Sequence, residues 1–415
     1  MTLALLTPWY DFRDLGNPID ALLNWINGWG DGSTYHWVAW IVAGLIGAAA
    51  IGLFLGVVML SLIWLERRAI ARIQIRRGPN RLGPFGVLQP LADALKLMQK
   101  EALTPRVGDK LPFWAAPLVI FIPAVLVYGV LPFGPKMVIA NLNVAVLYVI
   151  AIGSATPLIV FMAGWSSNNK YSLLGAMRAV AMAISYEIPM VLALLSVVVF
   201  TGHMDLNGIV QWQQQRHVFL VFLLPLGALI YFIAASAELN RTPTDIAEAE
   251  SEIVAGYHTE YSGMKFGLFY AVELANALAV GGIVATLFFG GWWLYGLDRW
   301  VPPYLIFVAK MYLFYGGFIL TRGTLPRLRI DQLLAFAWKF LLPLGLANVL
   351  IAALEVMLWQ QYTWPTEVVI PVFAVINIAL AGILVVGYVQ TFGFARITKP
   401  RTINLVNDPL ALMPQ

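Results

Sequence analysis

Long apolar runs are the feature of this sequence that most constrains its fold. An α-helix needs about 20 mostly apolar residues to cross the hydrocarbon core of a bilayer, and the 415-residue chain contains nine such runs. They are too long for membrane β-strands and lack the alternation of apolar and polar residues that such strands show. We therefore expect an all-α integral membrane protein with about nine transmembrane helices. The predicted spans are 37–65, 115–133, 142–164, 179–200, 218–237, 267–291, 301–320, 333–358 and 368–389.

Composition argues against several other classes of protein. Charged residues make up 12% of the chain, whereas a soluble domain carries about 25%, and the mean hydropathy is +0.77. Because the chain has no cysteine, it cannot itself hold a disulfide, a thiolate-bound iron–sulfur cluster or a cysteine nucleophile. No phosphate-binding loop, dinucleotide fingerprint or HExxH motif occurs, and the four histidines are scattered over loops. We expect no metal and no cofactor in this chain, so any redox cofactor would belong to another chain.

The distribution of positive charge predicts the orientation in the membrane. Twenty of the 26 Lys and Arg residues fall in the stretches after spans one, three, five and seven and in the C-terminal tail. Because basic residues are enriched on the cytoplasmic side, we expect the N-terminus outside and the C-terminus in the cytoplasm. The first 36 residues lack the basic start and apolar core of a signal peptide. No internal repeat is visible, which argues against a secondary transporter.

The first predicted cytoplasmic loop, residues 66–114, is long and strongly basic. It holds ten Lys and Arg residues, and after the turn residues from Gly78 to Pro84 apolar residues recur at helical spacing from Val87 to Met98. This pattern indicates an amphipathic helix that lies at the membrane interface. Two interpretations remain open: a lipid-binding anchor, or a docking surface for a peripheral partner over a lateral opening into the bundle. Nucleic acid is not an expected partner, because anionic lipid explains the basic charge.

Three glutamates lie inside or at the end of predicted spans, namely Glu187, Glu238 and Glu273. A charged residue at the bilayer centre costs about 2.5–3.5 kcal/mol on insertion scales, so such residues normally face the interior of a bundle. There they could form satisfied ion pairs, with Lys310 or Lys339 as partners, or they could form a path for protons. Glu355, near the outer end of its span, is expected to be an interfacial residue.

The predicted cytoplasmic loop 238–266 is acidic, unlike the other cytoplasmic segments. Its only basic residues are Arg241 and Lys265. Asp245 followed by Glu248 resembles the start of a capped helix, on which Glu248 and Glu252 would share one face. Either the loop is simply a solvated acidic segment, or its carboxylates lead from the cytoplasm to the glutamates in the spans. Its six acids are Glu238, Asp245, Glu248, Glu250, Glu252 and Glu260.

The chain contains several long, ordered motifs. In the first loop they are residues 66–68 (ERR), 74–80 (QIRRGPN), 88–93 (LQPLAD) and 96–101 (KLMQKE). Further motifs are residues 185–187 (SYE), 237–261, 322–327 (RGTLPR), 331–333 (DQL), 338–339 (WK) and 342–343 (LP). Together they resemble one known family, the quinone-chamber membrane subunit (the H subunit) of respiratory complex I, the proton-pumping NADH–quinone oxidoreductase. The resemblance covers roughly residues 38 to 358. It departs from the family pattern at Thr244, where the family usually has Phe, and at Ile330, where it usually has Tyr.

The resemblance implies a function and a set of site residues. The family protein forms much of a chamber that admits a long-tailed quinone, which is reduced by an iron–sulfur cluster of the attached peripheral arm. FMN and the iron–sulfur clusters belong to partner subunits, and buried carboxylates link the chamber to antiporter-like membrane subunits. The residues that match the quinone passage are Glu66, Arg67 and Arg76. The residues that match the proton path are Glu187, Glu238, Asp245, Glu248, Glu250, Glu252, Glu260 and Glu273.

The expected organisation follows from this resemblance. Residues 1–36 form an extracytoplasmic segment, residues 37–358 an eight-span family core, and residues 359–415 an additional ninth span with a cytoplasmic tail. An energy-transducing membrane is implied, most simply the bacterial inner membrane. Two alternatives remain: the related membrane component of a proton-pumping hydrogenase or ferredoxin-dependent complex, which would reduce no quinone, and a stand-alone cation transporter.

Overall fold

The computed structural model describes residues 36–241, 244–246, 253–297, 300–362 and 365–391, and within these ranges all regular structure is helical. Among the described residues, eight helical segments are long and apolar enough to cross a membrane. This confirms the predicted class, an all-α protein with many membrane spans. The eight segments are Gly44–Ile73, Lys110–Val130, Ala145–Ser166, Lys170–Thr201, Met264–Phe288, Pro303–Thr324, Ile330–Tyr362 and Glu367–Gly387.

The helices follow one another along the chain, most of them with short connections. Their bounds are α2 (His36–Ile73), η1 (Pro84–Gly86), α3 (Gln89–Gln99), α4 (Lys110–Val119), α5 (Phe121–Val130), α6 (Ala145–Gly153), α7 (Ala155–Ser166), α8 (Lys170–Thr201), α9 (Leu206–Arg216), α10 (Leu220–Leu223), α11 (Pro225–Glu238), η2 (Gly256–His258), α13 (Met264–Phe288), α14 (Pro303–Thr324), α15 (Ile330–Phe336), η4 (Ala337–Leu341), α16 (Leu342–Tyr362) and α17 (Thr366–Thr391).

Several predicted spans are interrupted rather than continuous. α4 and α5 meet at Ile120, α6 and α7 meet at Ser154, and α10 and α11 meet at Leu224 in front of Pro225. α15 passes into α16 through a single π-helical turn, η4. The predicted span 218–237 is therefore not one long helix: its main part, α11, has only 14 residues. Proline explains this break, because it has no backbone N–H and restricts the residue before it.

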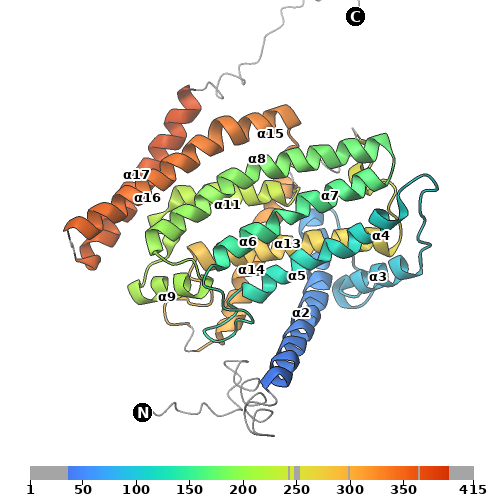
Figure 1. The fold of residues 1–415 in the computed structure, drawn as a ribbon, viewed down its shortest axis with the longest axis horizontal. Helices are drawn as coiled ribbons and strands as arrows, with labels where there is room; N and C mark the ends of the chain where they lie inside the picture. The colour runs from blue at the N-terminus through green and yellow to red at the C-terminus, as the bar shows by residue number, and fades with distance from the viewer. Residues whose placement is uncertain (1–35, 242–243, 247–252, 298–299, 363–364, 392–415) are drawn as a thin grey trace, which may run out of the picture.

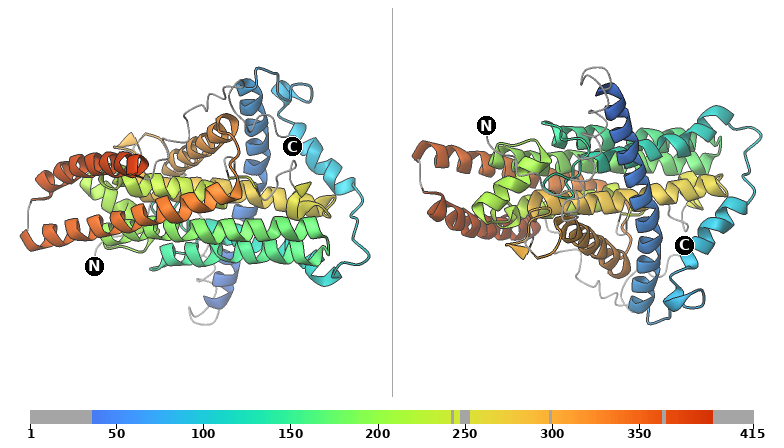
Figure 2. Two further views of the ribbon diagram at one scale, coloured as in Figure 1. Left: turned by 90° about the horizontal axis from the view of Figure 1, so that it is seen from above. Right: turned by 90° about the horizontal axis from the view of Figure 1, so that it is seen from below.

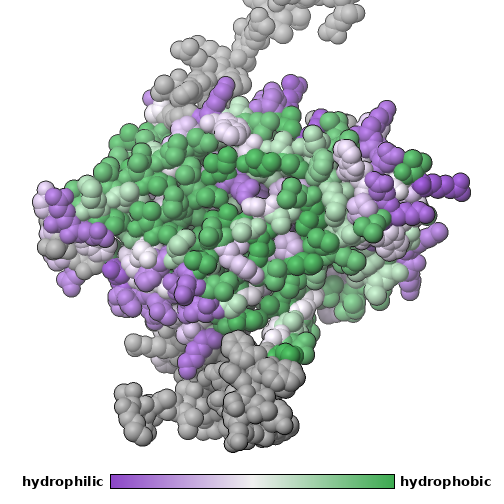
Figure 3. Space-filling model, in the orientation of Figure 1, coloured by the Kyte–Doolittle hydropathy of each residue, from purple (hydrophilic) through white to green (hydrophobic). Residues whose placement is uncertain are grey.

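The long helices form an elongated bundle, and α2 runs steeply across it (Figures 1 and 2). α8 lies at the centre of the packing, where it contacts α7, α11 and α16, while α13 packs against α5 and α14. α3 lies at one end of the bundle and α17 at the other (Figure 1). On the face shown in Figure 3, hydrophobic residues cover the middle, and hydrophilic residues gather toward the two ends.

The connections predicted to share one side of the membrane do contact one another. The Ser262 hydroxyl of the fifth predicted loop donates to the carbonyl of Glu101 in the first loop at 3.1 Å. The Asn168 side chain of the third loop donates to the carbonyl of Val107 in the first loop at 3.3 Å. These contacts place three alternate loops at the same end of the bundle, as the charge distribution predicted.

The loops predicted for the opposite side also meet. The Asn207 side chain donates to the carbonyl of Pro135 at 3.3 Å, which joins the fourth loop to the second. Gln213 is fully buried and donates to the carbonyl of Thr286 at 3.0 Å, near the end of α13. The alternation of the spans is thus consistent from α4 to α13.

The amphipathic helix predicted in the first loop is present as α3. Its apolar residues Leu91, Leu95 and Met98 are all about half exposed or more, so α3 presents an uncovered apolar face. This face agrees with both interpretations from the sequence, a lipid surface and a docked partner. The N-terminal segment predicted for residues 1–36 lies almost wholly outside the described residues.

Candidate functional site

A buried carboxylate, Glu66, is the centre of a polar cluster inside the bundle. It lies in the last third of α2, and its side chain is 4% exposed. Oε1 accepts a hydrogen bond from Nη1 of Arg241 at 2.6 Å and another from Nη1 of Arg322, while Oε2 accepts from the hydroxyl of Tyr315 at 2.6 Å. We call Glu66, Arg241, Glu273, Tyr315 and Arg322 the Glu66 cluster.

Arg241 extends this cluster to a second carboxylate. Its Nε lies 3.0 Å from Oε1 of Glu273 on α13, and its own side chain is 3% exposed. Burial alone would lower the pKa of the Arg241 guanidinium, but Glu273 and Glu66 together outweigh that effect and raise the pKa above its usual value. Arg241 is therefore charged at every accessible pH and holds two carboxylates that come from different spans.

The charges of the Glu66 cluster balance, because two carboxylates face two guanidinium groups. Removing one partner of a buried ion pair leaves an uncompensated charge, which costs about 3–5 kcal/mol. The cluster connects α2, the segment after α11, α13 and α14, so it ties together four parts of the bundle. A network of this kind responds to any change of charge next to it, since its groups share one another's field.

A second ion pair lies in the same segment after α11. Nη2 of Arg327 donates to Oδ2 of Asp245 at 2.7 Å, and Asp245 is 8% exposed. The pair joins the acidic loop to the chain that follows α14. The next acids, Glu248, Glu250 and Glu252, lie outside the described residues, so the predicted capped helix and the role of these three side chains stay predictions.

Glu260 lies apart from these residues. Its Oε1 accepts a hydrogen bond from the side chain of Asn169 at 2.7 Å. Asn169 also caps α8, because its Oδ1 accepts from the backbone N–H of Tyr171 at 3.0 Å. In the described structure Glu260 therefore fixes the entry into α8, and its place in a proton path stays a prediction.

Glu187 and Glu238 come together at the interruption between α6 and α7. The hydroxyl of Ser154 donates to Oε1 of Glu187. At the preceding residue, a Cβ placed on Gly153 would lie 3.4 Å from Oε1 of Glu238. The two carboxylates therefore approach the same break from α8 and from α11, and their charges repel each other. Glu238 is three residues before Arg241, which links this pair to the Glu66 cluster through one turn of the chain.

The two predicted arginines of the quinone passage have different surroundings. Nη1 of Arg67 donates to Oδ2 of Asp93 on α3 at 2.5 Å, so Arg67 ties the end of α2 to the exposed amphipathic helix. Arg76 is exposed, and its Nε donates to the side chain of Gln74 at 2.7 Å. The structure thus brings Glu66 and Arg67 to the same end of α2 but does not bring Arg76 into the Glu66 cluster.

The proposed pairing of carboxylates with lysines is wrong for Lys310. Its ammonium group donates to the carbonyl of Phe289, the C-cap residue of α13, at 2.7 Å, and to the carbonyls of Gly291 at 2.8 Å and Trp293 at 2.6 Å in the connection that follows. A cation stabilises a helix C-terminus, where unpaired carbonyls carry partial negative charge. Lys339 is exposed, and within the described residues it forms no ion pair with these carboxylates.

Glu355, which the sequence analysis expected to be an interfacial residue, is covered by its neighbours in the bundle. Its side chain lies in the interior at 6% exposure and accepts a hydrogen bond from Asn377 of α17 at 2.9 Å. The sequence suggested an interfacial position only because Glu355 lies near the end of its span. The position of a carboxylate along a helix does not reveal which neighbouring helix covers it.

The sequence did not identify the basic and hydroxyl partners of these acids. They are Ser154, Arg241, Tyr315, Arg322 and Arg327. A general signal was available, because buried carboxylates require cationic or hydrogen-bonding partners. Arg241 and Arg322 are basic residues at the ends of apolar helices, on the same predicted side as Glu66. Tyr315 and Ser154 carry no comparable signal.

Among the described residues there is no cluster of side chains suited to hold a metal ion.

These features together define a class: an integral membrane protein whose helical bundle holds a balanced network of buried charges. The chain also matches the family model described as NADH dehydrogenase over residues 46–353. It is 54% identical over 305 residues to the NADH-quinone oxidoreductase H subunit of Dehalococcoides mccartyi strain CBDB1, an alignment that covers 74% of this chain and 84% of that protein. It is 48% identical over 320 residues to the protein of the same name from Carboxydothermus hydrogenoformans, covering 77% and 91%.

A third relative gives the same result. The NADH-quinone oxidoreductase H subunit of Brevibacillus brevis is 45% identical over 297 residues, which cover 71% of this chain and 87% of that protein. The chain therefore belongs to the family of NADH-quinone oxidoreductase H subunits. This confirms the resemblance seen in the motifs of the first loop. The matched residues end at 353 in the family model, so α17 lies beyond them.

Proposed function

We propose that this chain is the membrane component of a proton-translocating NADH–quinone oxidoreductase, where it lines the quinone passage and couples quinone reduction to proton movement. Membership of the H-subunit family supports the first part of this proposal. The observation that carries the second part is the Glu66 cluster, because it joins the predicted quinone passage at Glu66 to the predicted proton path at Glu273 through one shared guanidinium.

The coupling proposed here depends on charge. Reduction of a neutral quinone to a neutral quinol consumes two electrons and two protons. If groups that line a passage near Glu66 supply these protons, those groups become more negative by the charge that they lose. In a low-dielectric interior such a change is felt over several ångströms. Arg241 would shift its interaction from one of its two carboxylate partners, Glu66 and Glu273, to the other. Glu238 lies three residues before Arg241 and would pass the change in charge to Glu187. Asp245 and Arg327 would control proton exchange with the cytoplasm.

The partners follow from the same proposal. Subunits of a peripheral arm would carry FMN and the iron–sulfur clusters and would dock against the first loop, where α3 exposes its apolar face. Antiporter-like membrane subunits would receive the signal from the carboxylates. We place the N-terminus outside and the C-terminus in the cytoplasm, in a bacterial inner membrane, because basic residues gather on the loops that lie together at one end.

The quinone passage can be tested with the purified complex in two assays. Arg76→Ala should weaken electron transfer to a quinone and leave transfer to a hydrophilic artificial acceptor unchanged, since the latter depends only on the peripheral arm. Arg77→Ala is a matched control, because Arg77 is a neighbouring exposed residue of the same loop. Equal losses in both assays would indicate failed assembly, and an unchanged quinone activity would contradict the role of Arg76.

A further inference from the structure

The fifth predicted span is broken inside the bundle, and the break leaves a backbone carbonyl to be satisfied. Leu223 ends α10, Leu224 has a non-helical backbone (φ −127°, ψ 57°), and Pro225 starts α11. Carbonyls in the last turn of a helix have no partner further along the same helix. Inside a membrane such a group costs several kcal/mol unless another residue or an ordered water donates a hydrogen bond to it.

A side chain from α17 supplies that donor. Nδ2 of Asn377 donates to the carbonyl of Leu223 at 2.6 Å and to Oε2 of Glu355 on α16 at 2.9 Å. A side-chain amide has two N–H groups, so both donors of Asn377 are used. Asn377 is 6% exposed. One residue therefore connects the broken span, α16 and α17.

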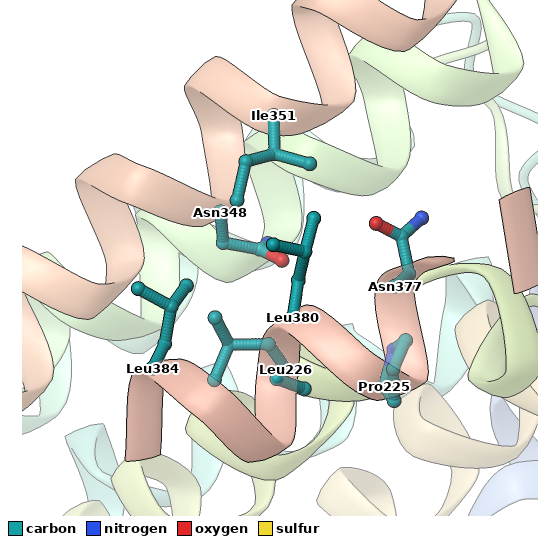
Figure 4. A pocket seen from close by; sticks show the side chains of 8 residues that line it. Pro225, Leu226, Asn348, Ile351, Asn377, Leu380 and Leu384 are labelled. Atoms are coloured by element: carbon teal, nitrogen blue, oxygen red, sulfur yellow. The ribbon is translucent and has the colours of Figure 1, made fainter. Parts of the chain in front are cut away.

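A small cavity lies beside this contact and is lined from the same three elements. Its volume is about 10 Å³, and Pro225, Leu226, Asn348, Asn377 and Leu380 are among the residues around it (Figure 4). This is close to the space that one water molecule requires. Asn348 is 5% exposed, and among the described residues its Nδ2 has no hydrogen-bond partner. A buried amide N–H at the wall of a water-sized cavity is suited to bind one water.

We propose that α17 clamps the broken fifth span: Asn377 replaces the hydrogen bond lost at the Leu224 break, and one water bound at Asn348 completes a polar seam between α11, α16 and α17. The polar groups fit this purpose, because an amide inside a membrane is costly unless it is paired across helices. Much of the remainder of α17 is apolar and exposed, for example at Val375 and Ile383. Asn377 is thus the polar anchor of α17, next to the buried apolar residues Val369, Ile370 and Phe373.

The clamp has a consequence for the rest of the chain. α11 begins at the clamped break and ends at Glu238, so a helix that is fixed at its first residue also holds the carboxylate at its last. The helix beyond the family match would in this way help to position a carboxylate of the family core. This inference concerns the packing of α17 and stands whether or not the chain reduces quinone.

The proposal can be tested in the full complex by cross-linking, because the chain has no native cysteine. Cysteines at Leu226 and Leu380, which both line the cavity, should be joined by a short bifunctional thiol reagent. In that background Asn377→Leu and Asn377→Ala, which both lack the amide donors, should reduce the cross-linked fraction several-fold and lower the melting temperature of the complex. Ile378→Leu, at the exposed neighbouring residue, should change neither quantity.

Specific outcomes would overturn the clamp. Undiminished cross-linking with an unchanged melting temperature in Asn377→Leu would show that packing alone holds α17. If Asn377→Ala behaved like the wild type, a donor to the Leu223 carbonyl would not be required. If Asn377→Leu does not accumulate, Asn377→Ser, which keeps one donor, should show an intermediate cross-linked fraction, and a wild-type fraction would contradict the proposal. An experimental density map should show one water at Asn348, and a dry cavity there would refute that part.

Discussion

The guanidinium of Arg241 donates to the carboxylate of Glu66 at 2.6 Å, although the two residues are separated by 175 positions in the chain. Arg241 also contacts Glu273, so it is the shared partner of two acids. We expect Arg241→Met to lower the melting temperature of the complex strongly, because an unpaired buried charge costs about 3–5 kcal/mol. Adding Glu273→Gln should recover part of the loss, since it removes one of the unpaired charges. No recovery in the double variant would argue against a shared pair.

The pair of Asp245 and Arg327 gives a second prediction. Asp245→Asn and Arg327→Gln each break a charged hydrogen bond that contributes about 1.5–3 kcal/mol. Because we propose that this pair controls proton exchange with the cytoplasm, each variant should reduce quinone-linked turnover clearly. The double variant should be little worse than either single variant, because contacting residues do not act independently. The measurement is turnover with quinone for the wild type and the three variants. Additive losses would show that the two residues act separately.

A third prediction concerns proton movement at the break between α6 and α7. Glu187→Gln keeps the size of the side chain but removes its charge, so we expect the complex to assemble and to lose both turnover and protons translocated per electron. Ser154→Ala leaves the Glu187 carboxylate in place and removes the Ser154 hydroxyl, which contacts Glu187 and the carbonyl of Ile150, and it should reduce turnover less. Both quantities can be measured together in reconstituted vesicles. Full turnover at full proton yield in Glu187→Gln would exclude Glu187 from the mechanism.

The orientation can be tested by labelling single cysteines with an impermeant reagent from either side of the membrane. Positions 80 and 254 should react from the cytoplasm, and positions 215 and 295 from outside, because Asn80, Val254, Gln215 and Tyr295 are exposed in the connections between spans. Gln213 and Gly256, which belong to two of the same connections, are buried and unsuitable. Labelling of position 80 from outside would reverse the orientation.

Much of the fold could be predicted because membrane spans are encoded locally. The length of an apolar run and the spacing of basic residues are sufficient to find the helices and their alternation. The interruption of the fifth span was harder to predict from the sequence. Pro225 is visible in the sequence, but proline is tolerated in many membrane helices when neighbouring groups satisfy the freed carbonyls. Whether a proline bends or breaks a span therefore depends on residues elsewhere, here on Asn377.

The candidate site could be predicted only in part, for a related reason. An acid inside or at the end of an apolar run is conspicuous, so Glu187, Glu238 and Glu273 could be found individually, whereas Glu66 was identified only through the family resemblance. Their partners could not, because a tyrosine or a serine is common in membrane helices. The sequence also does not show whether a lysine in a span pairs with a carboxylate or binds backbone carbonyls. Lys310 has the residue type expected for a carboxylate partner but lies against the end of α13.

The sequence separation within the Glu66 cluster has a consequence for synthesis of the protein. Arg241 and Arg322 follow Glu66 by 175 and 256 residues. Ribosomes add about 5–20 residues per second, so α2 is made roughly ten to fifty seconds before its last ionic partner exists. During this interval the Glu66 carboxylate must remain protonated, stay near the lipid headgroups or be shielded by the insertion machinery. The cluster can close only after α14 has been made, which makes it a marker for completed assembly of the bundle rather than for its beginning.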